Sequence, residues 1–278
     1  MTYCMQNSSS ELQTVLITGG TSGLGLELVK LFLRRGYYVI ATGRKSMEVP
    51  EFEDRFKLYR VDFCDLRQTA DTIRTICDNY SINYVINNAG ILSPPDFTTT
   101  KDGIEYTFQV NFLAHLLINE IIIQRFGKSH PLRLSAITSV VCKIAKPATT
   151  FSRNKEDYTP LKAYSDSKLF LTIMCNLLVK KYQDIDFRCF SIDPGVFGSS
   201  IYRMQDSWFR FLYHVAAPFM RRPSKIAMAL ADILTENEFT NGVIYDTRKR
   251  IRHRKEIDSS SLNTFREECY KMLKPFLD

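Results

Sequence analysis

The chain has 278 residues, 45% of them hydrophobic, and a formal net charge of +7 at pH 7. It is long enough to bury a full core, and because no linker or shift of composition divides it, we expect one domain over residues 1–278. Seven scattered cysteines, without a C-x-x-C pair, argue against a disulfide framework or a metal site and favour a reducing compartment. The N-terminus holds no apolar signal core, so we expect a cytoplasmic protein.

Short apolar runs rich in β-branched and aromatic residues alternate with segments of helical periodicity. The runs predict strands at Thr14–Thr18, Tyr37–Ala41, Phe56–Val61, Asn83–Asn87, Leu132–Thr138, Asp186–Ile192 and Gly242–Tyr245. The periodic segments predict helices at Leu24–Arg35, Leu66–Asn79, Gly103–Arg125, Ala163–Tyr182 and Ser224–Thr235. This alternation predicts an α/β fold, a doubly wound parallel sheet of about seven strands with helices on both faces.

Two connections depart from the regular alternation. The helix between the second and third strands is expected to be short or missing, because residues 44–55 hold few apolar side chains. The segment 199–222 follows the sixth strand and is dense in aromatics. Ligands of open α/β sheets bind beyond the carboxyl ends of the strands, so we interpret this segment as a variable substrate-binding segment.

The turn between the first strand and the first helix is rich in glycine, with Gly19, Gly23 and Gly25 in a G-x-x-x-G-x-G spacing. Such a turn lets the backbone approach a pyrophosphate and points the free N–H groups of the helix at the negative charge. The spacing differs from the common dinucleotide fingerprint G-x-G-x-x-G, and a plain strand-to-helix turn is the alternative.

The end of the second strand bears on the choice of cofactor. Arg44 and Lys45 offer two cations and no acid for ribose hydroxyls, so a 2′-phosphate is the better match. Arg44 is the first choice because a guanidinium can form two hydrogen bonds to phosphate; an ordinary surface arginine is the alternative. The sequence therefore favours NADP(H) over NAD(H).

Polar residues also end later strands. Asp62 follows the third strand and Asn87-Asn88-Ala89-Gly90 ends the fourth, on the rim where an adenosine would lie, although such residues can be mere turn formers. Asn111 lies in a helix that is otherwise apolar on that face, where an amide is unusual without a partner. His115 is interpreted as a structural histidine.

Tyr164 and Lys168 stand four residues apart and share one face of a predicted helix. A neighbouring ammonium lowers the pKa of a phenol from about 10, which makes it a usable proton donor and acceptor near neutral pH. Ser139 closes the fifth strand at the same end of the sheet, where its hydroxyl could bind a substrate carbonyl. Thr138 is a neighbouring candidate, and a chance serine is the alternative. With the glycine turn, the pair indicates a nucleotide-dependent oxidoreductase.

These motifs, in this order, resemble the short-chain dehydrogenase/reductases over nearly the whole chain. The resemblance implies a Rossmann-type fold and a catalytic tetrad of Asn111, Ser139, Tyr164 and Lys168, with Tyr164 as general acid/base. In the family's mechanism Ser139 polarises the substrate oxygen, Lys168 binds the nicotinamide ribose and Asn111 holds a water. The implied cofactor contacts are Gly19, Thr21, Ser22, Gly23, Leu24, Gly25, Arg44, Asp62, Phe63, Asn88, Ala89, Gly90, Tyr164, Lys168, Pro194, Gly195, Val196 and Ser199.

Within the family the chain looks most similar to the retinol dehydrogenase and WW-domain oxidoreductase branch, from residues 163–169 and 208–219. That likeness implies a lipophilic carbonyl or alcohol as substrate, similar to retinal, a steroid or an aldehyde. Two alternatives stay open: a reductase of a conjugated C=C bond, as in the similar protochlorophyllide reductases, and a non-catalytic NADP-binding redox sensor.

Partners other than the substrate are less defined. The basic segment 248–255 is either a solvated edge or a peripheral contact with an anionic membrane, and no nucleic acid is expected. Relatives often form a homodimer through the two long helices, here 103–125 and 163–182. Phe170, Ile173, Met174 and Leu177 do not exclude a homodimer, but they could equally be a core stripe.

Overall fold

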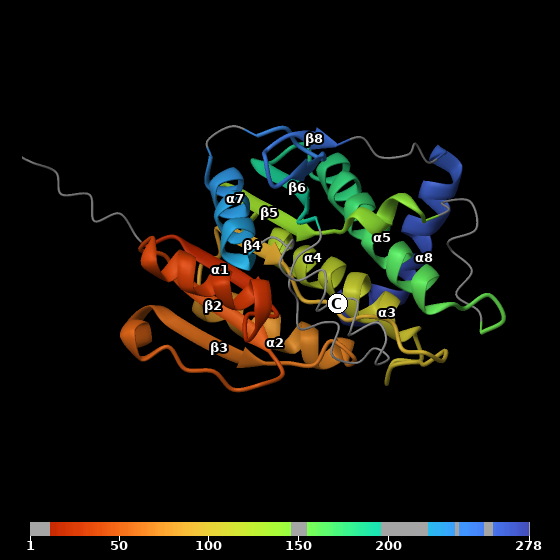
Figure 1. The fold of residues 1–278 in the computed structure, drawn as a ribbon, viewed down its shortest axis with the longest axis horizontal. Helices are drawn as coiled ribbons and strands as arrows, with labels where there is room; N and C mark the ends of the chain where they lie inside the picture. Colours follow the sequence, from red (N-terminus) through yellow and green to blue (C-terminus); the bar gives the residue numbers. More distant parts are fainter. Residues whose placement is uncertain (1–11, 146–154, 196–221, 237–238, 253–257, 278) are drawn as a thin grey trace, which may run out of the picture.

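The structure is a computed structural model that describes residues 12–145, 155–195, 222–236, 239–252 and 258–277 (Figure 1). Eight strands form one sheet in the order β3-β2-β1-β4-β5-β6-β7-β8. They are β1 (Thr14–Thr18), β2 (Tyr38–Gly43), β3 (Phe56–Arg60), β4 (Tyr84–Asn87), β5 (Leu132–Ile137), β6 (Phe187–Asp193), β7 (Ile244–Asp246) and β8 (Ile251–Arg252).

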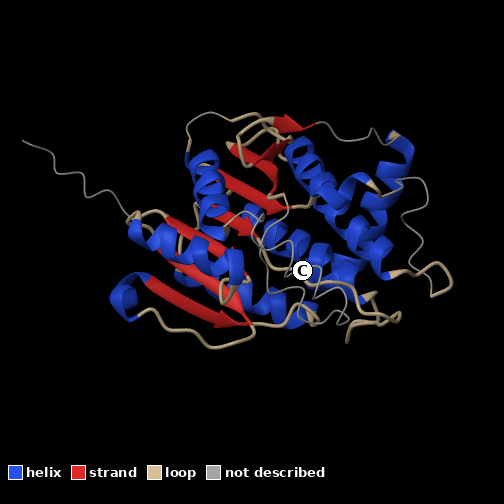
Figure 2. Cartoon of the chain, viewed as in Figure 1, coloured by secondary structure: helices blue, strands red, loops and turns tan. Residues whose placement is uncertain are grey.

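Neighbouring strands run parallel from β3 to β7, and the edge strand β8 pairs antiparallel with β7. Figure 2 shows the strands as one layer with helices on both sides. The predicted α/β class with a doubly wound parallel sheet is therefore confirmed. The sequence did not predict β8, because this two-residue strand is exposed and carries no apolar pattern.

The helices divide between the two faces of the sheet. They are α1 (Gly23–Arg34), α2 (Leu66–Asn79), α3 (Tyr106–Phe108), α4 (Ala114–Phe126), α5 (Pro160–Lys181), α7 (Pro223–Thr235) and α8 (Ser259–Leu277). Helices α1 and α7 share one apolar cluster, whereas α2, α4, α5 and α8 share another. The connection between β2 and β3 holds only the short 3-10 helix Pro50–Arg55, in agreement with the expected short or missing helix.

Helix α5, which carries Tyr164 and Lys168, begins three residues earlier than its apolar periodicity predicts. Thr159 is its N-cap and accepts a hydrogen bond from the backbone N–H of Lys162 at 3.3 Å, and Pro160 occupies the first turn. Both are favourable at a helix start because they leave few N–H groups unsatisfied. Tyr164 is thereby held one turn inside the helix.

The helix predicted at 103–125 runs from Tyr106 to Phe126, and its middle, Gln109–Leu113, is a π-helical turn. Such turns are rare and occur often at functional sites. This run is the one described helix long and apolar enough to cross a membrane, but 94% of its most apolar window is buried within the fold. It has the character of a core helix.

Helix α8 lies over α4 and α5 (Figure 1). Its residues Phe265, Cys269 and Leu273 recur every four positions and are buried. The Phe265 ring stacks 4.6 Å from Phe170 of α5 and 5.5 Å from Phe112. Helix α8 of this chain therefore packs on α4 and contacts α5 at Phe170.

A buried carboxylate secures the same contact. Glu120 of α4 is fully buried and accepts hydrogen bonds from Lys181 Nζ and Tyr182 Oη, both at 2.7 Å, and from Tyr270 Oη of α8. Because a buried polar side chain is costly without hydrogen-bond partners, these three groups stabilise one arrangement of α4, α5 and α8.

The described part of the basic segment is paired within the chain. Asp246 binds the guanidinium groups of Arg250 at 2.8 Å and Arg252 at 2.9 Å, and Lys249 pairs with Glu236. Asp246 lies on the β7–β8 hairpin itself, and Glu236 follows helix α7. Most of the described cations of the segment therefore have acidic partners within the chain. Residues 253–255 lie outside the described residues.

Candidate active site

The turn after β1 is shaped by glycines that no other residue could replace. Gly19 has φ +66°, and a Cβ there would lie 2.9 Å from Cα of Ala89. A Cβ at Gly25 would lie 2.1 Å from the backbone O of Gly19. The side-chain amide of Asn88 donates to the backbone O of Thr18 at 2.8 Å. The ends of β1 and β4 are therefore held together with almost no space between their backbones.

The first turn of α1 has the features of an anion site. Its N-cap, Ser22, makes no side-chain cap hydrogen bond, and no acidic residue lies in the first turn. The N–H groups at the start of a helix have no partner within it, and the helix dipole favours negative charge there. A phosphate at this position would satisfy both.

A cavity of about 320 Å³ lies beyond the carboxyl ends of β1 and β4, where the strand order reverses. In open α/β sheets this switch point is where ligands bind. Of the residues predicted from the sequence, those that line the cavity are Gly19, Thr21, Ser22, Gly23, Leu24, Gly25, Arg44, Asp62, Phe63, Asn88, Ala89, Gly90, Ser139, Tyr164, Lys168, Pro194 and Gly195. Asn111 does not line it, and Val196, Ser199 and the segment 199–222 lie outside the described residues.

Sequence reasoning missed part of the lining. The further residues are Thr42, Gly43, Val61, Ile91, Leu92, Tyr106, Val110 and Ile137, whereas Lys45 and Thr138, which also line the cavity, were named from the sequence beside Arg44 and Ser139. Most of the further residues are sequence neighbours of a predicted residue at a strand end, so their position in the sequence could have indicated that they line the cavity. Tyr106 and Val110 are different, because they come from the long helix and only its packing brings them to the cavity.

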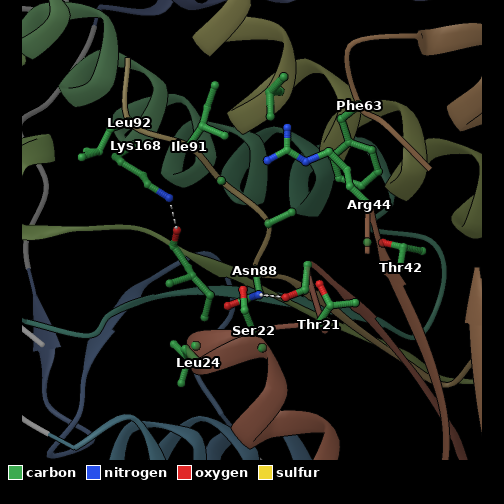
Figure 3. A pocket seen from close by; sticks show the side chains of 18 of the residues that line it. Thr21, Ser22, Leu24, Thr42, Arg44, Phe63, Asn88, Ile91, Leu92 and Lys168 are labelled. Atoms are coloured by element: carbon green, nitrogen blue, oxygen red, sulfur yellow. Dashed lines mark hydrogen bonds between the residues drawn. The ribbon is translucent and has the colours of Figure 1, made fainter. Parts of the chain in front are cut away.

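Charged groups mark two ends of the cavity. In Figure 3, Lys168 and Arg44 lie on opposite sides of the view, and Thr21, Ser22 and Leu24 lie below them at the start of α1. The guanidinium of Arg44 extends into the cavity beside Phe63. This arrangement offers cations at both ends and helix N–H groups in the middle, which suits an elongated molecule with phosphates.

Lys168 is the buried cation of the site. It is 4% exposed, its Nζ donates to the backbone O of Ile137 at 3.1 Å, and its Nζ lies 5.8 Å from the ring centroid of Tyr164. Burial lowers the pKa of Lys168 from its usual 10.5 to about 8. The ammonium is therefore still charged at neutral pH.

Asn111 has the partners that its position in an apolar helix required. It is fully buried, accepts from the N–H of Ile91 at 2.8 Å, and donates to Ile91 O and to Ser167 Oγ, both at 3.0 Å. A Cβ at Gly90 would lie 3.3 Å from Lys168 Nζ and 3.4 Å from Asn111 Oδ1. Asn111 thus joins the loop after β4 to α5 next to Lys168.

The two neighbouring hydroxyls after β5 have separate roles. Thr138 is buried and its Oγ1 donates to the backbone O of Lys168 at 2.8 Å. Ser139 is half-buried, and among the described residues its Oγ has only a long 3.5 Å contact with the N–H of Val141. Ser139 is therefore the better placed of the two to bind a ligand.

The sheet, its switch-point cavity and the glycine turn define a nucleotide-binding α/β protein whose cavity holds a Tyr/Lys pair. Residues 13–208 match the family model described as short chain dehydrogenase. The chain belongs to this family, whose members are oxidoreductases that bind NAD(P).

Curated relatives agree with the predicted branch. Retinol dehydrogenase 12 of Mus musculus is 26% identical over 232 residues, which cover 80% of this chain and 73% of the relative. The WW domain-containing oxidoreductase of Drosophila melanogaster is 27% identical over 246 residues, 82% of this chain and 59% of the relative. The short-chain dehydrogenase TIC 32 A, chloroplastic, of Brassica napus is 27% identical, and the match spans 65% of that protein's length.

Solved structures with the same fold are more distant in sequence. A short-chain dehydrogenase from Streptomyces avermitilis aligns with a TM-score of 0.68 at 16% identity, covering 96% of this chain and 97% of that chain. ElxO, solved with NADP bound, also aligns with a TM-score of 0.68, at 17% identity, covering 85% and 97%. At these identities the likeness shows the fold alone.

Proposed function

We propose that the protein transfers a hydride between NADP(H) and a lipophilic carbonyl compound or the corresponding alcohol. The observation that carries the proposal is the placement of Ser139, Tyr164 and Lys168 on the same cavity as the glycine turn. A proton-transfer group and a phosphate-binding turn are both needed for this reaction, and here they share one space.

The chain's residues fit the dinucleotide. The closely packed glycine turn and the uncapped start of α1 would hold the pyrophosphate. Arg44 and Lys45 are exposed at the cavity rim and would bind a 2′-phosphate, whereas the end of β2 offers no carboxylate to ribose hydroxyls. When bound, the dinucleotide supplies or accepts the hydride.

The protein's part in the chemistry is to hold the substrate oxygen and move a proton. Ser139 Oγ would donate a hydrogen bond to that oxygen, and the Tyr164 hydroxyl would give the proton in reduction and take it in oxidation. Lys168 would bind the nicotinamide ribose, and its nearby charge favours the ionised form of the phenol. Asn111 would fix the loop at Ile91 and the segment at Ser167 on either side of the ammonium.

Apolar side chains around Ser139 and Tyr164 support a lipophilic substrate. Val140 and Ile144, which follow Ser139, are 40% and 55% exposed, and Leu161, three residues before Tyr164, is 59% exposed. Such side chains favour contact with a large apolar ligand. The names of the relatives, which include retinol dehydrogenases and a human polyprenol dehydrogenase 25% identical to this chain, point in the same direction.

Location and partners complete the proposal. The odd number of scattered cysteines supports a cytoplasmic location. A peripheral contact of the segment 248–255 with an anionic membrane is supported only by its charge, and the pairing of Arg250 and Arg252 with Asp246 weakens that support. We do not propose a homodimer through α4 and α5, because α8 lies over them.

The test is NADPH oxidation at neutral pH against aldehydes, steroid ketones, retinal and enones, with NADH as the control cofactor. Tyr164→Phe should lower kcat by at least about a hundredfold, the usual contribution of a positioned acid/base. Tyr80→Phe, a tyrosine outside the cavity lining, is the matched control and should keep the wild-type rate. Arg44→Ala should raise the KM for NADPH and leave that for NADH little changed.

Equal rates for wild type and Tyr164→Phe would remove Tyr164 from its role. An enone separates the two reductase reactions, because an allylic alcohol indicates carbonyl reduction and a saturated ketone indicates reduction of the double bond. Tight NADPH binding without turnover of any compound would favour the redox sensor.

A further inference from the structure

His115 of α4 is fully buried and uses both of its ring nitrogens. Nε2 lies 3.0 Å from Thr18 Oγ1 at the end of β1, and Nδ1 lies 3.0 Å from the backbone O of Asn111. The ring of Phe63 packs edge-on at 5.4 Å. The imidazole therefore bridges the strand before the glycine turn and the helix that carries Asn111.

The imidazole is neutral at pH 7 and above. Burial is the main reason that the pKa of His115 falls from 6.5 to about 4; the hydrogen bond to Asn111 O opposes the fall, and the nearby charge of Lys168 adds to it. A neutral imidazole has one N–H donor and one acceptor nitrogen. The two contacts must therefore have opposite directions.

The neighbours of Thr18 decide which nitrogen carries the proton. Thr18 Oγ1 accepts from the N–H of Asn88 at 2.9 Å and from the N–H of Ala89 at 3.0 Å, which uses both of its lone pairs. Its own hydrogen then points to His115 Nε2 at 3.0 Å, since the alternative acceptor, Ile86 O, is 3.4 Å away. Nε2 accepts, so Nδ1 carries the proton and donates to Asn111 O.

The carbonyl of Asn111 belongs to the π-helical turn Gln109–Leu113. In this turn the N–H of Ala114 donates to the backbone O of Gln109, five residues back, and not four residues back as in an α-helix. A side-chain donor on a carbonyl in this irregular turn restrains the backbone from which the Asn111 side chain extends. The Asn111 amide then holds Ile91 and Ser167. One continuous set of hydrogen bonds runs from the end of β1 to the residue before Lys168.

We propose that His115 is a positioning residue, a neutral Nδ1–H imidazole that couples the cofactor-binding ends of β1 and β4 to Asn111 of the tetrad. The inference deepens the proposed function and rests on it for its kinetic consequence. It assigns a role in catalysis to a residue that the sequence indicated as structural only.

The tautomer is measured by ¹⁵N NMR of the histidine side chains, and this measurement requires no turnover. The chain has four histidines, and His115→Phe identifies the signals that belong to His115. The expected spectrum is that of a neutral ring protonated on Nδ1, unchanged between pH 6 and pH 9. A ring protonated on Nε2, or one that titrates within this range, would overturn the proposal.

The catalytic role is measured by a double-mutant cycle with Asn111. His115→Phe keeps the ring volume and removes both hydrogen bonds; it should lower kcat about tenfold and change the KM for the carbonyl substrate less than about threefold. In the presence of Asn111→Ala, the same change should lower kcat less than about twofold further, because residues that act as a unit are not additive. Additive losses in kcat would overturn the proposal.

His130→Phe is the matched control, because it removes a comparable contact, between Nε2 and Ile82 O at 2.7 Å, outside the cavity lining. It should leave kcat unchanged. NADPH titration by fluorescence separates this inference from the proposed reaction. His115→Phe should bind NADPH at least about threefold more weakly than His130→Phe even if no substrate is turned over, and equal affinities would contradict the coupling.

Discussion

Lys168 holds its charge where little solvent reaches it, and this has a measurable effect on stability. Its pKa is about 8 in the folded protein and 10.5 when exposed, so between these values the unfolded chain binds more protons and wild-type stability rises with pH. Below pH 8 the full penalty of the buried charge is present. We expect Lys168→Met to abolish turnover yet to be more stable than wild type at pH 7, with an advantage that shrinks by about 3 kcal/mol by pH 10.5.

Urea unfolding at pH 7, 9 and 10, without cofactor, measures this difference. Lys180→Met is the control, since Lys180 lies near the end of the same helix and is exposed. The difference in the free energy of unfolding between Lys180→Met and wild type should be the same at the three pH values. A pH-independent difference for Lys168→Met as well would show that the lysine titrates normally in the folded protein.

Asp166, two residues after Tyr164, has the opposite effect to Lys168 on how stability varies with pH. It is 6% exposed, its Oδ1 has no hydrogen-bond partner among the residues that the structure describes, and burial raises its pKa from 3.8 to about 7, with Lys162 opposing the rise and Glu105 adding to it. Between pH 3.8 and pH 7 the folded state binds the extra proton. Stability is therefore lost as pH rises through this window and stays reduced above it.

Asp166→Asn removes the charge and keeps the shape. The variant should be about 2–4 kcal/mol more stable than wild type at pH 8, and the two proteins should be nearly equal at pH 4. Thermal unfolding at the two pH values tests this, with Asp71→Asn on the exposed side of α2 as control. A gain of the same size at both pH values would mean that Asp166 is not buried as a charge.

At the scale of the elements, α8 packs against side chains next to two members of the tetrad. Phe265 packs between Phe112, next to Asn111, and Phe170, two residues after Lys168. Phe265→Ala should cost about 3–5 kcal/mol of the free energy of unfolding, the usual loss for a fully buried phenylalanine. Lys271→Ala, on the exposed side of the same helix, should change it by less than about 0.5 kcal/mol in urea unfolding. A small loss for Phe265→Ala would mean that α8 is not part of the cooperative core.

An element could be predicted well where the sequence pattern that specifies it lies within the element itself. Helix α2 matches its prediction at both ends because its apolar stripe and its N-cap, Asp65, are local. Helix α8 was not predicted, although Phe265, Cys269 and Leu273 supplied a four-residue period, because charged residues and Pro275 surround them. The π-helical turn Gln109–Leu113 was predicted as ordinary α-helix. Nothing local to these residues indicates the turn, and the partners of its Asn111, Ile91 and Ser167, come from elsewhere in the fold.

The candidate site divides in the same way. Residues that follow strands line the cavity as expected, because parallel strands end at one edge of the sheet and this follows from the order of the elements alone. The distinct uses of Thr138 and Ser139, the bridge made by His115, and the lining by Tyr106 and Val110 depend on helix packing. No local pattern specifies such contacts.

For the whole molecule, the position of α8 predicts a monomer in solution. Three of the four residues considered for a dimer interface, Phe170, Ile173 and Met174, are at most 2% exposed, and Leu177 is half-buried. Sedimentation velocity at micromolar concentration should give a species of 32.2 kDa. A dimer that Leu177→Glu on α5 dissociates would contradict this expectation, because it would require α5 to be reachable by a second copy.

The place of α8 in the sequence also bears on how the protein is made. The ribosome synthesises α8 after every strand of the sheet, yet Phe265 and Leu273 complete the apolar cluster that α4 and α5 begin. Until α8 emerges, the nascent chain exposes Phe108, Phe112 and Phe170, the kind of apolar surface that makes partly folded chains associate. Once α8 is in place, the guanidinium groups of Arg67 and Arg74 on α2 bind the carbonyls of Pro275 and Phe276 and hold the end of α8 against α2.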